Sequence, residues 1–567
     1  MNININRALR IASVLLAQMV LVYGHFRDHG VVTVAIFIVL LLAFLVLSSI
    51  HSSLTKQDKI AKAKLELDQR NAARKSGKWI EFSENGSEYI DEDHPYSKDL
   101  NLFGKASLFQ YLNEANTKWG KDILKLLFLT DKRDQTTLAR RQEAIKEISA
   151  NQGFCESLNI TGMLSKSISK DPTEMVDFFE SNQSLFTKPT ISLTVRSLPI
   201  GIILLIIINF VAGYNNALVI LTGVAIIVQV MVFASLSNRT EATLKELSKF
   251  GDSLDDFGTM VELIRETKFL AEANKIWQDK LPSKWNLKKI TWALKVRNIT
   301  LVDLLLNILF LWDIHCVSIL EKMRQKGAKD MGIWLETIGY FETMVSVAIL
   351  PRLNPDWVYP DFNEKYTSIK AKNLAHPLIN EFDRVANDFE LTGVAIISGS
   401  NMSGKTTFLR TVGVNLVLAY SGGFVCAEAM VFSRMGIVTQ MRVADSLNEG
   451  ISTFYAELKR IKMIIDYAEK QPLMFLIDEI FKGTNSVDRL AGAKTVIAKL
   501  NALGAVGMIS THDLELCELE GNYARIKNYS FSERYKDNRI YFDYRIKQGK
   551  SSVTNAKYLM KMVGITD

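Results

Sequence analysis

Two pairs of long apolar runs stand out from the mixed polar and apolar pattern of this chain. They occupy residues 11–22 and 31–50 in the first pair, and residues 198–212 and 217–236 in the second. The second run of each pair has the roughly 20 apolar residues that a helix needs to cross a bilayer. A short polar turn separates the two runs within each pair. The pattern therefore predicts two transmembrane helical hairpins.

Basic residues predict how these hairpins are oriented. Arg7 and Arg10 precede the first run, and a series of Lys and Arg residues lies between positions 56 and 78. An excess of Lys and Arg marks the cytoplasmic flanks of membrane spans. An even number of crossings then keeps residues 51–197 and 237–567 on the same, cytoplasmic side. We expect a multi-pass protein of the cytoplasmic (inner) membrane.

Two features leave other topologies open. The first apolar run could belong to a signal peptide, although no small-x-small cleavage motif precedes His25 and a longer apolar run follows at once. Residues 301–315 are nearly apolar enough for a fifth span, which would place the C-terminal part outside the cytoplasm. That segment contains Asp303, Asp313 and His315. Because buried charge in lipid is costly, we expect a buried core helix there.

The C-terminal third has a different pattern, in which short apolar runs alternate with longer mixed segments. Residues 394–397, 473–477 and 505–510 are near-continuous apolar runs. Such runs are typical of strands that are buried on both faces of a parallel sheet. The pattern predicts an α/β domain. Ligands of open α/β sheets gather at the carboxyl ends of the strands, so the residues that follow each run are the candidates for chemistry.

The first of these strands leads into a phosphate-binding loop. Residues 399–406 match the pattern G-x-x-x-x-G-K-[ST], in which backbone N–H groups and a helix N-terminus bind phosphate oxygens. Lys405 supplies a positive charge for the outer phosphates, and Thr406 supplies a hydroxyl for Mg²⁺. The candidate nucleotide-binding residues are Gly399, Ser400, Asn401, Met402, Ser403, Gly404, Lys405, Thr406 and Thr407.

Acidic and imidazole side chains follow the other two strands. Asp478 ends the second strand, where a Walker B carboxylate holds Mg²⁺ through its water shell, and Glu479 is placed to orient or deprotonate the attacking water. His512 follows the third strand, within reach of a γ-phosphate. A solvated acidic pair and a structural histidine are the plain alternatives. With Lys405, the candidate catalytic residues are Glu479 and His512, and the candidate metal ligands are Thr406 and Asp478.

These residues resemble the ATPase domain of the MutS mismatch-repair family. The resemblance rests on Asn401-Met402 in the loop, on Gly483-Thr484 after the Walker B strand, and on the pair Thr511-His512. It implies ATP as the nucleotide and Mg²⁺ as the metal. It covers roughly residues 95–195 and 320–565, with weaker matches outside the ATPase domain.

A further segment of the family is present at residues 450–454, Gly-Ile-Ser-Thr-Phe. In MutS-like dimers this segment reaches the nucleotide of the partner subunit. The resemblance therefore implies a homodimer in which Ser452 and Thr453 complete the partner's site. Either residue could equally serve as a plain helix N-cap.

The expected fold is an α/β P-loop NTPase domain of the ABC/MutS type, preceded by an all-α core domain and two transmembrane hairpins. The expected parts are a transmembrane hairpin (1–50), a basic juxtamembrane segment (51–95), a first helical core part (96–197), a second hairpin (198–236), a second helical core part (237–370) and the ATPase domain (371–567).

Missing and intact motifs distinguish this chain from proteins of other function classes. Before the helical core there is no room for the family's mismatch-reading domain, so we expect no strong mismatch discrimination. A transporter ATPase has a Leu-Ser-Gly-Gly-Gln signature shortly before Walker B, whereas the Ser-Gly-Gly here, 421–423, follows the phosphate loop. Intact Lys405, Asp478 and Glu479 oppose a non-catalytic scaffold.

The charge balance leaves the partner open. The net charge of +7 permits DNA binding, but the basic residues between 56 and 78 equally suit an anionic membrane surface. The four cysteines are scattered without metal-ligand spacing, as in reduced structural thiols. The sequence predicts a membrane-anchored, MutS-like, dimeric ATPase, with DNA as one open partner. The alternative is an ATP-driven protein of membrane transport or remodelling that does not bind DNA.

Overall fold

The computed structural model divides the chain into two compact units, Met1–Ala72 and Ala73–Asp567. The structure describes residues 3–27, 30–130, 134–165, 173–181, 186, 189–211, 215–281, 300–400, 402–441, 453–481, 486–536 and 539–551.

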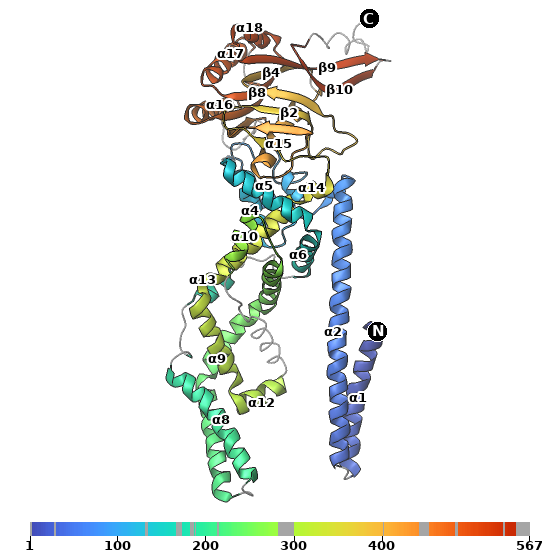
Figure 1. Cartoon of the computed structure of the whole chain (residues 1–567), viewed down its shortest axis with the longest axis vertical. Helices are drawn as coiled ribbons and strands as arrows, with labels where there is room; N and C mark the ends of the chain where they lie inside the picture. Colours follow the sequence, from blue (N-terminus) through green and yellow to red (C-terminus); the bar gives the residue numbers. More distant parts are fainter. Residues whose placement is uncertain are drawn as a thin grey trace. The chain divides into compact units, whose positions relative to one another are not determined.

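The first unit consists of two long helices. Helix α1 spans Ile3–Arg27, and helix α2 begins at Gly30 and continues to Lys75 (Figure 1). The guanidinium carbon of Arg10 lies 5.6 Å from the ring centroid of Phe44, so the two helices pack against each other as a hairpin. Val39, Leu42 and Val46 of α2 are more than half exposed. Among the described residues of its own unit, nothing covers this apolar surface.

The second unit begins with a helical part that is organised around α13. Its elements are η1 (Lys78–Glu81), η2 (Ser87–Tyr89), α3 (Leu108–Leu112), α4 (Lys118–Leu129), α5 (Gln135–Ala150), α6 (Gln152–Leu164), α7 (Thr173–Glu180), α8 (Pro189–Val211), α9 (Asn216–Glu266), α10 (Glu272–Asp279), α12 (Thr300–Phe310), α13 (Trp312–Val347) and α14 (Ile349–Leu353). Helix α13 packs against α4, α5, α7, α9 and α10 (Figure 1). Side-chain caps fix where several helices start: Thr117 accepts from the Gly120 N–H at α4, and Asp134 accepts from the Thr137 N–H at α5.

In the described residues, four helical segments are long and apolar enough to cross a membrane, by length and composition. They are Ala35–Lys75, Ile191–Val211, Asn216–Gly251 and Met331–Leu353. In the apolar stretch of each of the first three segments, 0%, 17% and 6% is buried inside the protein. In Met331–Leu353 the buried share of this stretch is 89%. The last segment is therefore covered by protein. The expected run 11–22 is not among these candidates.

The expectation of one buried core helix over residues 301–315 needs correction. Helix α12 ends at Phe310, Leu311 adopts a left-handed conformation with φ 52° and ψ 43°, and α13 begins at Trp312. The side chain of Asn307 accepts a hydrogen bond from the Asp313 N–H at 2.9 Å. This bond stabilises a corner in place of a continuous helix. With 11 residues, α12 is also shorter than a membrane span.

The C-terminal part is an α/β domain with two sheets. Its strands are β1 (Asp361–Phe362), β2 (Ile369–Leu374), β3 (Asn387–Leu391), β4 (Val394–Ser398), β5 (Ala429–Phe432), β6 (Gly436–Gln440), β7 (Leu473–Asp478), β8 (Val506–Thr511), β9 (Ile526–Lys536) and β10 (Arg539–Gln548). The smaller sheet has the order β1-β5-β2-β3, and the larger has the order β10-β9-β4-β8-β7-β6. In the larger sheet all neighbours are parallel except β10, which pairs antiparallel with β9.

Helices cover the larger sheet and explain its apolar strands. They are α15 (Lys405–Tyr420), α16 (Thr453–Lys470) and α17 (Ser486–Ala502), followed by η3 (Leu514–Glu518) and α18 (Leu519–Asn522). Along β7, Met474 and Leu476 join the core shared with α15 and the helical part, while Leu473, Phe475 and Ile477 join the core under α16 and α17. Alternate side chains of a strand point to opposite faces, so both faces of β7 are buried.

Candidate nucleotide-binding site

Three neighbouring parallel strands bring the predicted motifs to one edge of the larger sheet. Strand β4 leads into the phosphate loop, β7 ends at Asp478, and β8 ends at Thr511. In the register of the sheet, Ser398 pairs with Thr511 and Asp478 pairs with Ser510. The carboxyl ends of the three strands therefore lie side by side.

The phosphate loop has a backbone that requires glycine at two positions. Gly399 has φ 149°, and a Cβ there would lie 2.8 Å from the carbonyl oxygen of Phe531. Gly404 has φ 103° and is the N-cap of α15. Only glycine adopts these conformations at low cost. Met402, between them, is 82% exposed and also left-handed. Asn401 lies outside the described residues.

The ammonium group of Lys405 lies over the loop. Its Nζ donates to the carbonyl oxygens of Gly399 and Ser400, at 2.7 and 2.8 Å. It also lies 3.4 Å from Nε2 of His512. The hydroxyl of Ser403 donates to the same Ser400 carbonyl at 2.8 Å and holds the loop closed. A cation is thus placed where the pattern predicts the outer phosphates.

The two predicted metal ligands meet directly. The hydroxyl of Thr406 donates to Oδ2 of Asp478 at 2.8 Å, and the hydroxyl of Ser510 donates to Oδ1. Mg²⁺ prefers oxygen ligands and is bound through one or two protein groups, water and substrate phosphates. A hydroxyl and a carboxylate beside a phosphate loop fit this preference. Sequence reasoning did not assign a role to Ser510, whose only signal is its place next to Thr511.

The predicted catalytic pair is also in contact. Oε1 of Glu479 lies 2.6 Å from Nε2 of His512. Glu479 has φ 59°, and its N–H donates to the Ser510 carbonyl at 3.2 Å. The left-handed backbone turns the carboxylate away from the line of β7 and toward the end of β8. Strain of this kind is common at functional sites, where the surrounding structure stabilises it.

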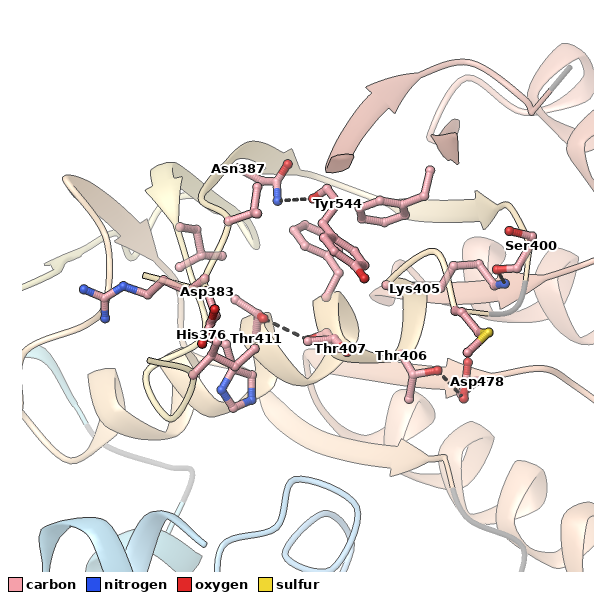
Figure 2. A pocket seen from close by; sticks show the side chains of 18 of the residues that line it. His376, Asp383, Asn387, Ser400, Lys405, Thr406, Thr407, Thr411, Asp478 and Tyr544 are labelled. Atoms are coloured by element: carbon pink, nitrogen blue, oxygen red, sulfur yellow. Dashed lines mark hydrogen bonds between the residues drawn. The ribbon is translucent and has the colours of Figure 1, made fainter. Parts of the chain in front are cut away.

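A cavity of 730 Å³ opens beside the loop, toward the smaller sheet (Figure 2). Its volume is in the range of small-molecule sites. It is lined by the loop residues and by residues of β2, β3, β10 and the segment between β2 and β3, among them His376, Asp383, Asn387 and Tyr544. Burial, with a smaller effect of Arg410, lowers the pKa of His376 to about 4, so this imidazole is neutral at physiological pH.

Tyr544 borders the candidate site, although no sequence motif predicted a role for it. Its ring faces the loop, because a Cβ on Gly404 would lie 3.0 Å from the Cδ1 atom of Tyr544. The amide of Asn387 fixes this position: it donates to the Tyr544 carbonyl at 3.1 Å and accepts from the Ile546 N–H at 2.8 Å. These bonds sit at a register shift between β9 and β10, and Tyr544 has φ 52°. Tyr544 as a whole is 43% exposed, and it borders the cavity.

Two predicted residues are not placed in this site. Ser452 lies outside the described residues, as do Gly483 and Thr484. Thr453 is the first residue of α16. Their role toward a partner subunit stays a prediction.

The part of the chain that contains this site is similar to known proteins. The MutS domain V family matches residues 395–566, which contain the loop, the Walker B strand and His512. The C-terminal part of this chain is therefore similar to MutS domain V. The DNA mismatch repair protein MutS of Aquifex pyrophilus is 33% identical over 257 residues, which are 44% of this chain and 30% of that protein. The protein of the same name from Thermosipho melanesiensis is 29% identical over 267 residues, 44% of this chain and 31% of its own length.

The chain thus spans about a third of the length of the curated relatives that it matches. The match to the family model lies in the C-terminal α/β domain of this chain. The observed fold, a helical region followed by an α/β domain, is consistent with this similarity.

Proposed function

We propose that this chain is a membrane-anchored MutS-type ATPase that binds Mg²⁺-ATP in the loop 399–407 and hydrolyses it as a dimeric switch. The observation that carries the proposal is the hydrogen bond of 2.8 Å between Thr406 and Asp478, directly beside a loop that holds the Lys405 ammonium. A hydroxyl, a carboxylate and a cation are the protein groups that phosphoryl transfer in this class of site needs.

Nucleotide binding uses groups that are already close together. The N-terminus of α15 and the loop N–H groups receive the phosphates, and Lys405 exchanges its loop carbonyls for phosphate oxygens. Thr406 and Asp478 would hold Mg²⁺, which would neutralise negative charge of the phosphates. The cavity beside Tyr544 receives the base and ribose, with the exposed face of the ring available for stacking.

Hydrolysis is assigned to Glu479 and His512. Glu479 orients the attacking water and accepts its proton, and His512 contacts the γ-phosphate. The 2.6 Å contact between them holds both side chains at the loop before phosphate arrives. Lys405, 3.4 Å from His512, adds positive charge on the same side.

The test is Glu479→Gln in the full-length protein purified in detergent. Because the amide cannot accept the proton, we expect the turnover rate to fall by roughly 10²–10⁴-fold, with ATP affinity retained. Turnover is measured by phosphate release and affinity by binding of a fluorescent ATP analogue. Lys405→Ala is the control that should lose binding as well. Turnover unchanged in the Gln variant would remove Glu479 as the base.

The dimer is tested by mixing two inactive variants. In one, Lys405→Ala disables the phosphate loop, and in the other Ser452 and Thr453 are both replaced by Ala. If the second pair acts in the partner's site, a mixed dimer contains one complete site, and activity returns on mixing. A mixture as inactive as its components would contradict action across the dimer.

Membrane anchoring is supported by three long helical segments, Ala35–Lys75, Ile191–Val211 and Asn216–Gly251. At most 17% of the apolar stretch of each is buried inside the protein. We assign them, with the run 11–22, to two hairpins in the cytoplasmic membrane, and we place residues 51–197 and 237–567 in the cytoplasm. Retention of the full chain in carbonate-washed membranes, and protection of the ATPase domain from protease in intact cells, are the expected results. Protein in the soluble fraction would contradict the proposal.

DNA is a second candidate partner. The matched relatives are named DNA mismatch repair proteins, and the net charge of this chain is +7. We expect DNA, if it is a ligand, to change the ATPase rate, with homoduplex, mismatched and branched DNA compared at stated salt because phosphate contacts are screened. No response to any DNA, with basal hydrolysis intact, would favour membrane transport or remodelling.

A further inference from the structure

The chain turns sharply between α12 and α13, and this corner lies beside the apolar part of α9 (Figure 1). Gln229 of α9 is fully buried and donates a hydrogen bond to the carbonyl oxygen of Ile308, 2.6 Å away. The neighbours of Gln229 on α9 stay uncovered: Val228 and Val230 are each 43% exposed. Ile308 therefore lies at a level of α9 where the surrounding surface is apolar and open.

The depth of the corner follows from helix geometry. The apolar run of α9 ends at residue 236, and Arg239 is the first charged residue beyond it. At a rise of about 1.5 Å per residue, Gln229 lies about 10 Å before the end of the run and about 15 Å before Arg239. If 236 marks the membrane surface, as in the hairpin proposed above, Ile308 lies below that surface.

In the irregular backbone of the corner, three N–H groups have hydrogen-bond partners. The Leu311 N–H donates to the Asn307 carbonyl at 3.1 Å, and the Asp313 N–H donates to the Asn307 side chain at 2.9 Å. The His315 N–H donates to the Leu311 carbonyl at 3.1 Å. Non-helical backbone at membrane depth is tolerated only where protein satisfies it in this way.

The tip of the corner presents large apolar side chains outward. Leu309 is 41% exposed and Phe310 is 39% exposed, so this end of α12 is not a covered core helix. Asp303, nearer the start of α12, accepts a hydrogen bond from Asn307 at 3.0 Å. Asp313, directly after the corner, is 5% exposed, so this second carboxylate is covered by protein.

We propose that the α12–α13 corner enters the cytoplasmic leaflet beside α9 as a re-entrant element, with Leu309 and Phe310 against lipid acyl chains. This inference rests on the membrane anchoring proposed above. Lipid is chosen as the occupant because Gln229 holds the corner at the level of α9 where the flanking Val228 and Val230 are each 43% exposed.

The corner gives the membrane a direct connection to the helical core. Helix α13 runs unbroken from Trp312 to Val347 and packs against α4, α5 and α10 along its way. A movement of the core relative to the bilayer therefore has to carry the corner with it. The second hairpin and this corner together form one membrane-contacting group of the helical part.

The test measures lipid exposure with spin labels in the full-length protein in lipid nanodiscs. Cys155, Cys316, Cys426 and Cys517 are first replaced by Ala, and retained ATPase activity shows that this background is folded. Leu309→Cys and Phe310→Cys are labelled separately. Leu221→Cys, in the apolar run of α9 and 51% exposed, is the lipid control. Leu270→Cys, between α9 and α10 and 78% exposed, is the water control.

Electron paramagnetic resonance then compares collisions with oxygen, which concentrates in lipid, and with a water-soluble nickel chelate. We expect labels at 309 and 310 to show the high oxygen-to-nickel ratio of position 221. A ratio like that of position 270, or shielding from both reagents, would overturn the inference while leaving the hairpin intact. A water-like ratio at position 221 itself would overturn the membrane hairpin and the inference together.

Discussion

Thr406 and Asp478 lie 72 positions apart in the sequence and share one hydrogen bond at the end of the sheet. Replacing Thr406 by Ala removes the hydroxyl that we assign to Mg²⁺, whereas Thr406→Ser keeps it. We expect the Ala variant to need at least about 10-fold more Mg²⁺ for half-maximal ATPase activity. The Ser variant should stay near the wild type. Equal Mg²⁺ dependence of both variants would show that this hydroxyl is not a ligand.

Tyr544 offers a second test at the residue scale. Its ring borders the cavity and lies against Gly404, so Tyr544→Ala removes the proposed stacking surface for the base. Stacking of a base on an aromatic side chain contributes about 1–3 kcal/mol, so ATP should bind roughly 10-fold more weakly. Tyr544→Phe keeps the ring and should bind like the wild type. Titration with a fluorescent ATP analogue measures both, and weak binding by the Phe variant would point to the hydroxyl instead.

At the scale of elements, one buried carboxylate joins α13 to the start of α4. Glu342 of α13 is 1% exposed and accepts the N–H of Asn116 at 3.0 Å, and it also accepts the hydroxyl of Thr117, the N-cap of α4. Burial raises the pKa of Glu342 to about 7, although the bonds from Thr117 and Asn116 act in the opposite direction. The folded protein therefore takes up a proton here that the unfolded chain releases at lower pH.

The sign of the pH effect follows from that shift. Since the folded-state pKa is above the ordinary value of 4.5, the stability gained from this proton is complete below about pH 4.5 and is lost as pH rises through about 7. Thermal unfolding of the detergent-purified protein should show a midpoint that falls between pH 5 and 8. In Glu342→Gln this fall should be smaller by roughly 2–4 °C. Identical pH profiles would mean that Glu342 does not titrate in this range.

Other contacts between elements also join segments that are distant in the sequence. Arg460 of α16 donates to the carbonyls of His94, Pro95 and Thr439, and Asp99 accepts from the Thr439 hydroxyl and the Met441 N–H. The segment before the helical core is thereby fixed to β6 and α16. Nothing in the local sequence around Arg460 indicates these partners.

For the whole molecule, two separate hairpins predict redundant anchoring. Removing residues 1–50 should leave the protein in carbonate-washed membranes, because the α8–α9 hairpin remains. Adding Ile220→Lys and Ile227→Lys, both at exposed positions of α9, should release it, since each Lys costs about 3 kcal/mol within a span. Membrane fractionation with immunoblotting distinguishes these cases. Release by the truncation alone would show that the second hairpin does not span.

Much of the nucleotide site was predictable because its motifs consist of residues that are contiguous in the sequence. The turn at Gly399 and Gly404 and the apolar strands before Lys405 and Asp478 are local patterns with a local physical cause. The sequence also indicated the apolar runs and the strand that ends directly before His512. It did not indicate Tyr544, which reaches the loop through a register shift between β9 and β10 and through bonds to Asn387.

By itself, the sequence determined the strand-loop-helix of the phosphate site, the acidic end of β7 and the apolar runs. These features depend on the spacing of apolar residues and on the turn-forming residues, which are both local properties of the chain. Only the tertiary structure decided that Glu479 contacts His512, that Ser510 holds Asp478, and that residues 301–315 form a corner instead of one helix. Each depends on side chains that meet only after the strands and helices pack. The corner at Leu311 is stabilised by Asn307, which accepts from the Asp313 N–H, and by Gln229, which donates to the Ile308 carbonyl.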